Sequence, residues 1–150
     1  MAQQYNNQSR GTNAGGYSKG GNSSYDKPQV TIPNIVLDYT KDVELFNTTA
    51  QEVASKIAQN RRPETKSTQM RNFYDYVLEL YEKSKSNIHF SEILPFVKML
   101  NSKVAYSKSR SHVNDEFVLM IQECVKQVDT PKKLEIFKLF FEAVIGFSKK

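Results

Sequence analysis

Residues 130–147 read TPKKLEIFKLFFEAVIGF, and this stretch decides the fold. Thr130 is a preferred N-cap residue, and Pro131 suits the first helical position, where its missing N–H costs nothing. One side of the predicted helix carries Leu134, Phe137, Phe141 and Val144, and another carries Ile136, Phe140, Ala143 and Phe147. Apolar residues therefore cover well over half of its circumference, which indicates a helix that is central in a bundle or shared with a partner.

Helical periodicity continues upstream of this stretch. Three more amphipathic helices are expected, with N-caps at Ser67, Ser91, and Asn114 or Asp115. Pro95 is expected to bend the second of them. Residues 48–60 form another helix, which ends before Pro63 and follows a short helical turn over 42–46. No stretch combines strand alternation with hairpin turn residues. The sequence therefore predicts an all-α fold, a compact bundle of about five helices.

The first 34 residues differ in composition from the rest. They hold five of the six glycines and no Leu or Phe, so they cannot bury enough apolar surface to offset their chain entropy. We expect residues 1–34 to be a flexible, disordered tail and residues 35–150 to be the helical domain. The tail carries three basic residues, one acid and three tyrosines. It is either a solubilising segment or a weak contact for single-stranded RNA.

Composition excludes several classes of protein. The chain has 150 residues, a formal net charge of +5 and one cysteine, Cys124. A single cysteine allows no internal disulfide and no cysteine cluster for zinc, so we expect a reducing, cytoplasmic setting. No apolar run approaches the roughly 18 residues that a membrane span needs, and the polar N-terminus does not resemble a secretory signal.

The sequence offers no catalytic constellation. His89 and His112 have no motif around them, and Cys124 falls on the apolar stripe of a predicted helix, where a thiol behaves as a small apolar group. The acids of residues 75–82 are spaced for ordinary ion pairs, Arg71–Asp75 and Glu79–Lys83. We therefore expect a protein that is not an enzyme and has no metal or cofactor.

Positive charge gathers in two stretches. Residues 56–71 hold five basic residues against one acid, and residues 98–114 hold four against none. Such stretches suit a groove that follows a phosphate backbone without reading bases. Lys103 and Tyr106, three residues apart, place a cation beside a ring that could stack on a base. Alternatively, Tyr106 packs inward and the cations form a solvated face.

Three segments together carry a family resemblance. Residues 67–73 (STQMRNF) are similar to a Thr/Ser-Ser/Thr-Gln-Ile-Arg-Lys-Phe run, and residues 100–106 (LNSKVAY) followed by Arg110 are similar to a Pro-Lys-Leu-Ala-Tyr…Arg segment. Residues 140–147 (FFEAVIGF) resemble a Phe-Phe-Glu-Ala-Ile-Val-Ala-Tyr terminal helix. These segments, in this order, resemble the small subunit of the type III-A CRISPR effector, the Csm complex. Ser102 stands where the family has proline, and Gly146 where it tends to have alanine.

The resemblance implies a non-catalytic, RNA-binding structural subunit of a ribonucleoprotein complex in antiviral defence. Several copies would stack along the guide–target RNA duplex and contact the target strand without sequence preference. The partners would be the backbone and large subunits of the effector, the guide and target RNA, and further copies of this chain, with no membrane.

The resemblance and the charge pattern together nominate residues for these contacts. Arg71, Lys103 and Arg110 carry over from the family motifs as RNA-binding residues. Charge alone adds Lys66, Lys108, Arg61 and Arg62, and the stacking argument adds Tyr106. The apolar excess on the last helix nominates Ile136, Phe140 and Phe147 as a subunit interface. The alternative is a helical protein–protein adaptor whose basic patches are incidental.

Overall fold

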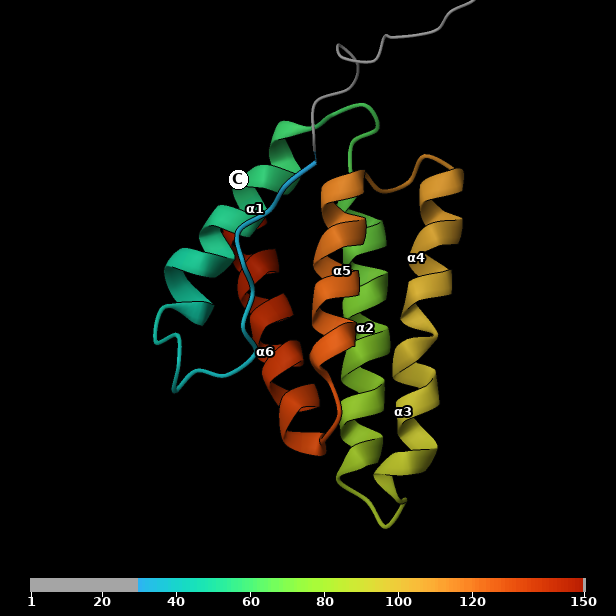
Figure 1. Cartoon of the computed structure of the whole chain (residues 1–150). Helices are drawn as coiled ribbons and strands as arrows, with labels where there is room; N and C mark the ends of the chain where they lie inside the picture. The colour runs from blue at the N-terminus through green and yellow to red at the C-terminus, as the bar shows by residue number, and fades with distance from the viewer. Residues whose placement is uncertain (1–29, 150) are drawn as a thin grey trace, which may run out of the picture.

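A computed structural model describes residues 30–149, and every regular element in that range is helical (Figure 1). A short π-helix precedes six α-helices: η1 (Leu45–Thr49), α1 (Ala50–Gln59), α2 (Ser67–Ser84), α3 (Phe90–Lys98), α4 (Leu100–Ser109), α5 (Asp115–Gln127) and α6 (Pro131–Ser148). The predicted all-α bundle is confirmed. It has six α-helices instead of five because the helix expected from Ser91 onward is divided at Met99 into α3 and α4.

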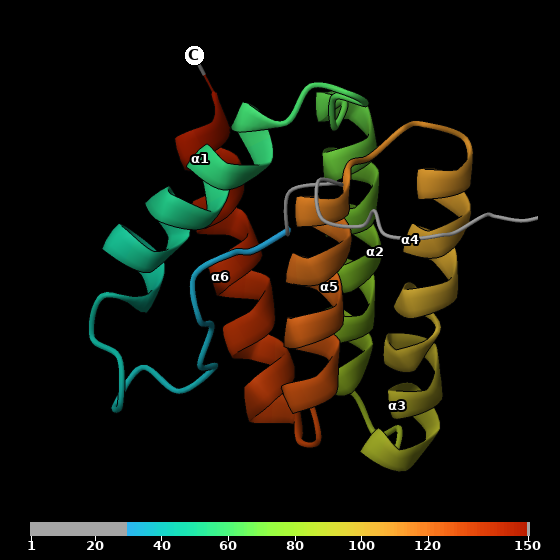
Figure 2. The same ribbon diagram turned by 45° about the horizontal axis from the view of Figure 1, so that its top comes forward.

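The helices are arranged around α2, α5 and α6. α3 and α4 follow one another along one edge of the bundle, and α1 lies at the other edge, inclined across α6 (Figures 1 and 2). α6 packs against α1, α2 and η1, and α5 packs against α4. Because α6 has neighbours on several sides, apolar residues around most of its circumference are buried within this chain.

Aromatic rings join three of these helices at the centre of the bundle. The Phe141 ring of α6 lies 5.7 Å from Tyr74 of α2 and 6.0 Å from Phe117 of α5, between ring centroids. Phe73 of α2 adds a second contact to Phe117, at 5.5 Å. Tilted and edge-on rings at these distances attract one another beyond their burial of apolar area. The cluster therefore fixes how α2, α5 and α6 approach each other.

Two of the predicted helix caps are confirmed and two are wrong. Asn114 accepts a hydrogen bond from the Phe117 N–H, and Thr130 accepts one from the Lys133 N–H. Ser67, by contrast, is already the first residue of α2, and its N-cap is Lys66. α3 likewise begins before Ser91, at Phe90. In both cases the residue in extended conformation comes earlier than the serine, so the hydroxyl cannot cap the helix.

The side chain of Asn114 connects distant segments. It is fully buried and donates to the backbone oxygens of Ile57 and Asn60, both at 2.8 Å, at the end of α1. Its backbone N–H donates to the Thr65 hydroxyl at 2.9 Å, just before α2. One residue thus caps α5, ends α1 and positions the connection that leads into α2.

The segment before η1, which contains Ile35 and Leu37, runs along the bundle. Ile35 and Leu37 are buried, and the Gln127 side chain holds this segment by donating to the Ile35 oxygen and accepting from the Leu37 N–H. Ile32 is half-buried against the same core, so packing begins three residues before the expected boundary at residue 35. The remainder of the predicted tail, residues 1–29, lies outside the described residues.

The predicted interface on α6 is largely internal. Ile136 and Phe140 are only 4% and 0% exposed and belong to the chain's own core, which corrects their nomination as interface residues. Phe147 is 40% exposed and is the one of the three that a partner could contact.

The connections of Asn114 yield a stability prediction. Replacing Asn114 with Ala removes a cap and takes the donor from one buried and one partly buried carbonyl oxygen, which costs about 3 kcal/mol of unfolding free energy. Thr130→Ala, the matched control, removes only an exposed cap and costs about 1 kcal/mol. Urea denaturation followed by circular dichroism measures both. Equal losses in the two variants would contradict the assigned role of Asn114.

Candidate nucleic-acid interface

A hollow of about 500 Å³ lies between α2 and α4, and we call it the α2–α4 hollow. One wall is formed by four residues of α2 whose spacing places them on one face of that helix: Gln69, Asn72, Phe73 and Tyr76. The other wall consists of Met99, Ser102, Lys103, Tyr106 and Ser107. Amide, hydroxyl, ammonium and aromatic groups converge here, and no acidic residue lines the hollow.

The sequence of α4 turns its aromatic and basic residues outward. Leu100 and Val104 are fully buried, and the mostly buried Ser107 donates a hydrogen bond to the Gln69 side chain at 3.2 Å. These three positions share one face of the helix, which leaves Lys103 and Tyr106 on the outer side. Tyr106 is 62% exposed, so the interpretation in which its ring packs inward is wrong.

Each of the two rings at the hollow, Tyr76 and Tyr106, has a cation beside it, but the pairing differs from the predicted one. The Lys103 ammonium lies 5.0 Å from the centre of the Tyr76 ring, across the hollow on α2. The Arg110 guanidinium lies 5.6 Å from the centre of the Tyr106 ring and donates to its hydroxyl at 3.0 Å. An i,i+4 spacing favours the Arg110–Tyr106 contact over the expected Lys103–Tyr106 contact. The result is two rings and two cations at one surface.

Tyr76 is the more enclosed of the two rings. Its hydroxyl donates to the Phe96 backbone oxygen at 2.9 Å, which fixes the ring beside Lys103. Burial, followed by the negative charge of Glu79, raises the pKa of Tyr76 above its ordinary value. The hydroxyl therefore stays protonated and neutral, and Lys103 is the charged residue among those that line the hollow.

Arg71 lies on the ridge of α2 and faces away from this hollow. Its guanidinium pairs with Asp75 at 3.4 Å, and Lys83 pairs with Glu79 at the same distance, so both predicted i,i+4 ion pairs are present. Arg71 and Asp75 are each more than half exposed, so their pair contributes little to stability. Arg71 also lines a second hollow, which we call the α1–α6 hollow and which Ile57, Arg61, Met70, Ile145 and Lys149 help to form.

The remaining predicted RNA-binding cations are placed around the same end of the bundle without lining the α2–α4 hollow. Lys108 pairs with Asp115 at 3.2 Å, which offsets its charge. Lys66 precedes α2, and its backbone N–H donates to the His112 oxygen. Arg61 lines the α1–α6 hollow, and Arg62 is an exposed loop residue.

The three residues considered for catalysis lie at a helix end, in a loop and in the core. His89 is the N-cap of α3, and His112 lies in the loop between α4 and α5. Cys124 is fully buried, and burial raises the pKa of its thiol well above the ordinary value. Within residues 30–149 no group of His, Cys, Asp or Glu side chains is arranged to hold a metal ion. None of the helices in this range is long and apolar enough to cross a membrane.

Comparison with protein-family models shows the family to which this chain belongs. Residues 40–150 match the family model described as Csm2 Type III-A, a span that includes every helix of the bundle. The chain belongs to the Csm2 family. As a member, it is a structural subunit of a type III-A CRISPR complex and assembles with the other subunits of the Csm effector. Neither curated proteins nor solved structures give a significant match.

The fold brings two of the Csm2-like sequence segments together. Gln69, Asn72 and Phe73 come from the segment at residues 67–73, and Lys103 and Tyr106 come from the segment at residues 100–106. All five residues line the α2–α4 hollow. The resemblance located these segments one at a time, whereas the structure shows that they share one surface.

The burial of Cys124 gives a direct check on the packing of α5. Because only the thiolate reacts with iodoacetamide, a buried thiol with a raised pKa should stay unmodified at pH 7.5 in the folded protein. The same cysteine should react fully in urea, and intact mass measures both because the chain has one thiol. Rapid modification under native conditions would show that α5 is not packed as described.

Proposed function

We propose that this Csm2-family chain is a non-catalytic subunit that contacts target RNA through the α2–α4 hollow, in several copies along the guide–target duplex, in antiviral defence. The observation that carries the proposal is the pairing of two rings that line one hollow with two cations, where no acid lines the hollow: Tyr76 pairs with Lys103, which also lines it, and Tyr106 pairs with Arg110, which lies beside it. Membership of a ribonucleoprotein family supports RNA as the ligand.

The chemistry of the hollow suits recognition without sequence preference. Lys103 and Arg110 offer positive charge to phosphates, which are the same at every nucleotide. The exposed Tyr106 ring offers a face on which any base can stack. Asn72 and Ser102, at the rim of the same hollow, can hydrogen-bond to riboses or phosphates. Arg71 faces away from this hollow and pairs with Asp75, so it lies outside the proposed contact.

Such a contact is weak for one copy. With about four phosphates neutralised on a single strand, the logarithm of affinity would fall with the logarithm of salt at a slope of roughly −3. Several copies held side by side would convert weak contacts into firm retention, because each later contact forms at high effective concentration. Repetition along the duplex is therefore part of the proposal.

The double variant Lys103→Ala/Arg110→Ala tests the phosphate contacts. We expect weaker binding of mixed-sequence single-stranded RNA and a salt slope smaller in magnitude by about 1.4, since two cations are lost. Fluorescence anisotropy at several salt concentrations measures both quantities, and a second RNA of different sequence should behave in the same way.

A control double variant removes equal charge elsewhere. Lys126 and Lys132 make exposed ion pairs with glutamates three residues away, at the ends of α5 and α6 far along the chain from α4. Their replacement by Ala should leave the salt slope unchanged. If both double variants lower the slope equally, RNA responds to net charge alone and the site assignment is wrong.

Two variants of Tyr106 distinguish base stacking from charge as the source of RNA affinity. Tyr106→Ala should weaken RNA binding by about 5- to 150-fold, because base stacking on an aromatic ring is worth roughly 1–3 kcal/mol. Tyr106→Phe keeps the ring and loses only the hydrogen bond from Arg110, so its affinity should stay near that of the unmodified protein. The same anisotropy titration applies. Equal losses in Ala and Phe variants would mean that the ring does not stack on RNA.

A further inference from the structure

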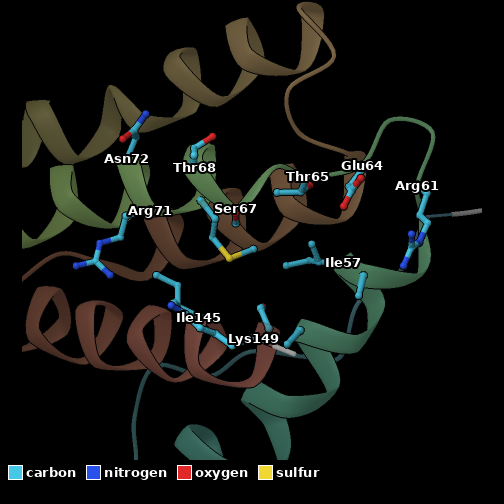
Figure 3. Close-up of a pocket in the computed structure, with 14 residues that line it drawn as sticks. Ile57, Arg61, Glu64, Thr65, Ser67, Thr68, Arg71, Asn72, Ile145 and Lys149 are labelled. Atoms are coloured by element: carbon cyan, nitrogen blue, oxygen red, sulfur yellow. The ribbon is translucent and has the colours of Figure 1, made fainter.

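The α1–α6 hollow is larger than the one assigned to RNA. Its volume is about 700 Å³, and its walls come from α1, the connection into α2, the first turns of α2 and the end of α6 (Figure 3). Residues 54–72 supply most of the lining, and the end of α6, distant in sequence, closes the hollow on the side of α2 away from α4. Asn72 lines both hollows, so the ridge of α2 separates them.

The floor of the α1–α6 hollow is aliphatic. Ala54 and Ile57 of α1, Met70 of α2 and Ile145 of α6 all line it. Methionine and isoleucine side chains accept large aliphatic groups, and methionine adapts its shape to them. A hollow with this floor is suited to an apolar side chain that a partner inserts as an anchor.

The rim of the same hollow is mainly basic. Arg61 and Arg71 lie at its two ends, and Lys149 lies between them on the α6 side (Figure 3). Glu64 is the acid that lines it. Three cations against one acid around an aliphatic floor complement a ligand that carries acids on both sides of an apolar group.

The lining also separates a protein ligand from RNA. The α2–α4 hollow presents Phe73, Tyr76 and Tyr106, whereas no aromatic residue lines the α1–α6 hollow. Stacking on rings is the main way in which proteins hold unpaired bases without sequence preference. Apolar grooves in which a few side chains anchor a segment are typical of peptide recognition, and the hydroxyls of Thr65, Ser67, Thr68 and Ser148, which also line this hollow, can hydrogen-bond to the backbone of such a segment. This difference in lining favours a protein ligand in the α1–α6 hollow and RNA in the α2–α4 hollow.

We infer that the α1–α6 hollow is a docking site for an acidic segment of another subunit of the complex, anchored by one or two large aliphatic side chains. The basic rim disfavours the chain's own N-terminal residues 1–34 as the occupant, since they carry three basic residues and one acid. The inference rests on membership of a multisubunit complex and does not depend on the proposed RNA contact.

Site-specific photo-crosslinking in the assembled complex tests this docking site. A benzophenone amino acid at Ala58, which lines the hollow, should crosslink to a partner peptide that mass spectrometry identifies as acidic and aliphatic. The same group at Gln59, the exposed neighbour that does not line the hollow, is the matched control and should not give that crosslink. Crosslinks from position 58 to RNA, to residues 1–29 of the same chain, or to nothing would overturn the inference.

A pair of charge reversals tests the rim. Arg61→Glu reverses a cation that lines the hollow, whereas Lys41→Glu reverses an exposed cation that lines neither hollow. We expect the Arg61 variant to be retained in the complex about threefold less well or worse, and the Lys41 variant to be retained normally. Circular dichroism checks that both variants fold. Equal retention, or an equal loss in both, would contradict the inferred docking site, and a loss of RNA binding by the isolated Arg61 variant would assign the hollow to RNA instead.

Discussion

Buried Asn114 makes the interactions on which the arrangement of the two hollows depends. Its side-chain amide closes the end of α1 and caps the start of α5, and its backbone N–H holds Thr65 in the connection that leads into α2. α2 forms a wall of both hollows, so its entry point sets where Arg71, Asn72 and Tyr76 face. An amide can donate to two carbonyls and accept from an N–H at once, which a hydroxyl or carboxylate cannot do. The hydrogen bonds of buried Asn114 thus help to position the surface residues of α2.

The two hollows divide the chemistry of the surface between them. Both have cations at the rim, so net charge alone does not distinguish them. The lining does: tyrosines and amides on the α4 side suit a nucleic acid, and isoleucine and methionine on the α1–α6 side suit a protein anchor. Under the two proposals, the subunit would bind an RNA strand at one hollow and a protein neighbour at the other. Because α2 lies between them, residues that line only one hollow, such as Tyr106 and Arg61, can be altered without touching the other, whereas Asn72 belongs to both.

Much of the fold could be predicted from the sequence because helical apolar stripes are local patterns. The stripes of α1, α2, α5 and α6 correspond to buried residues, and Asn114 and Thr130 act as caps. Local patterns could not show which apolar residues of α6 stay internal, since Ile136 and Phe140 are buried by α-helices distant in sequence. They also could not show that Lys103 contacts Tyr76 instead of Tyr106, or that the ends of α1 and α6 enclose a hollow with the start of α2. Those features exist only once the helices are packed.

The claim that the α2–α4 hollow holds the RNA is tested most directly by crosslinking from the RNA itself. A target strand carrying 4-thiouridine at successive positions would be bound in the assembled complex, irradiated and digested, and the crosslinked residues would be identified by mass spectrometry. We expect the crosslinks in this chain to fall on Tyr76, Tyr106 and their neighbours along α2 and α4. Crosslinks concentrated on the end of α1 and the end of α6, or absent from this chain, would contradict the assignment.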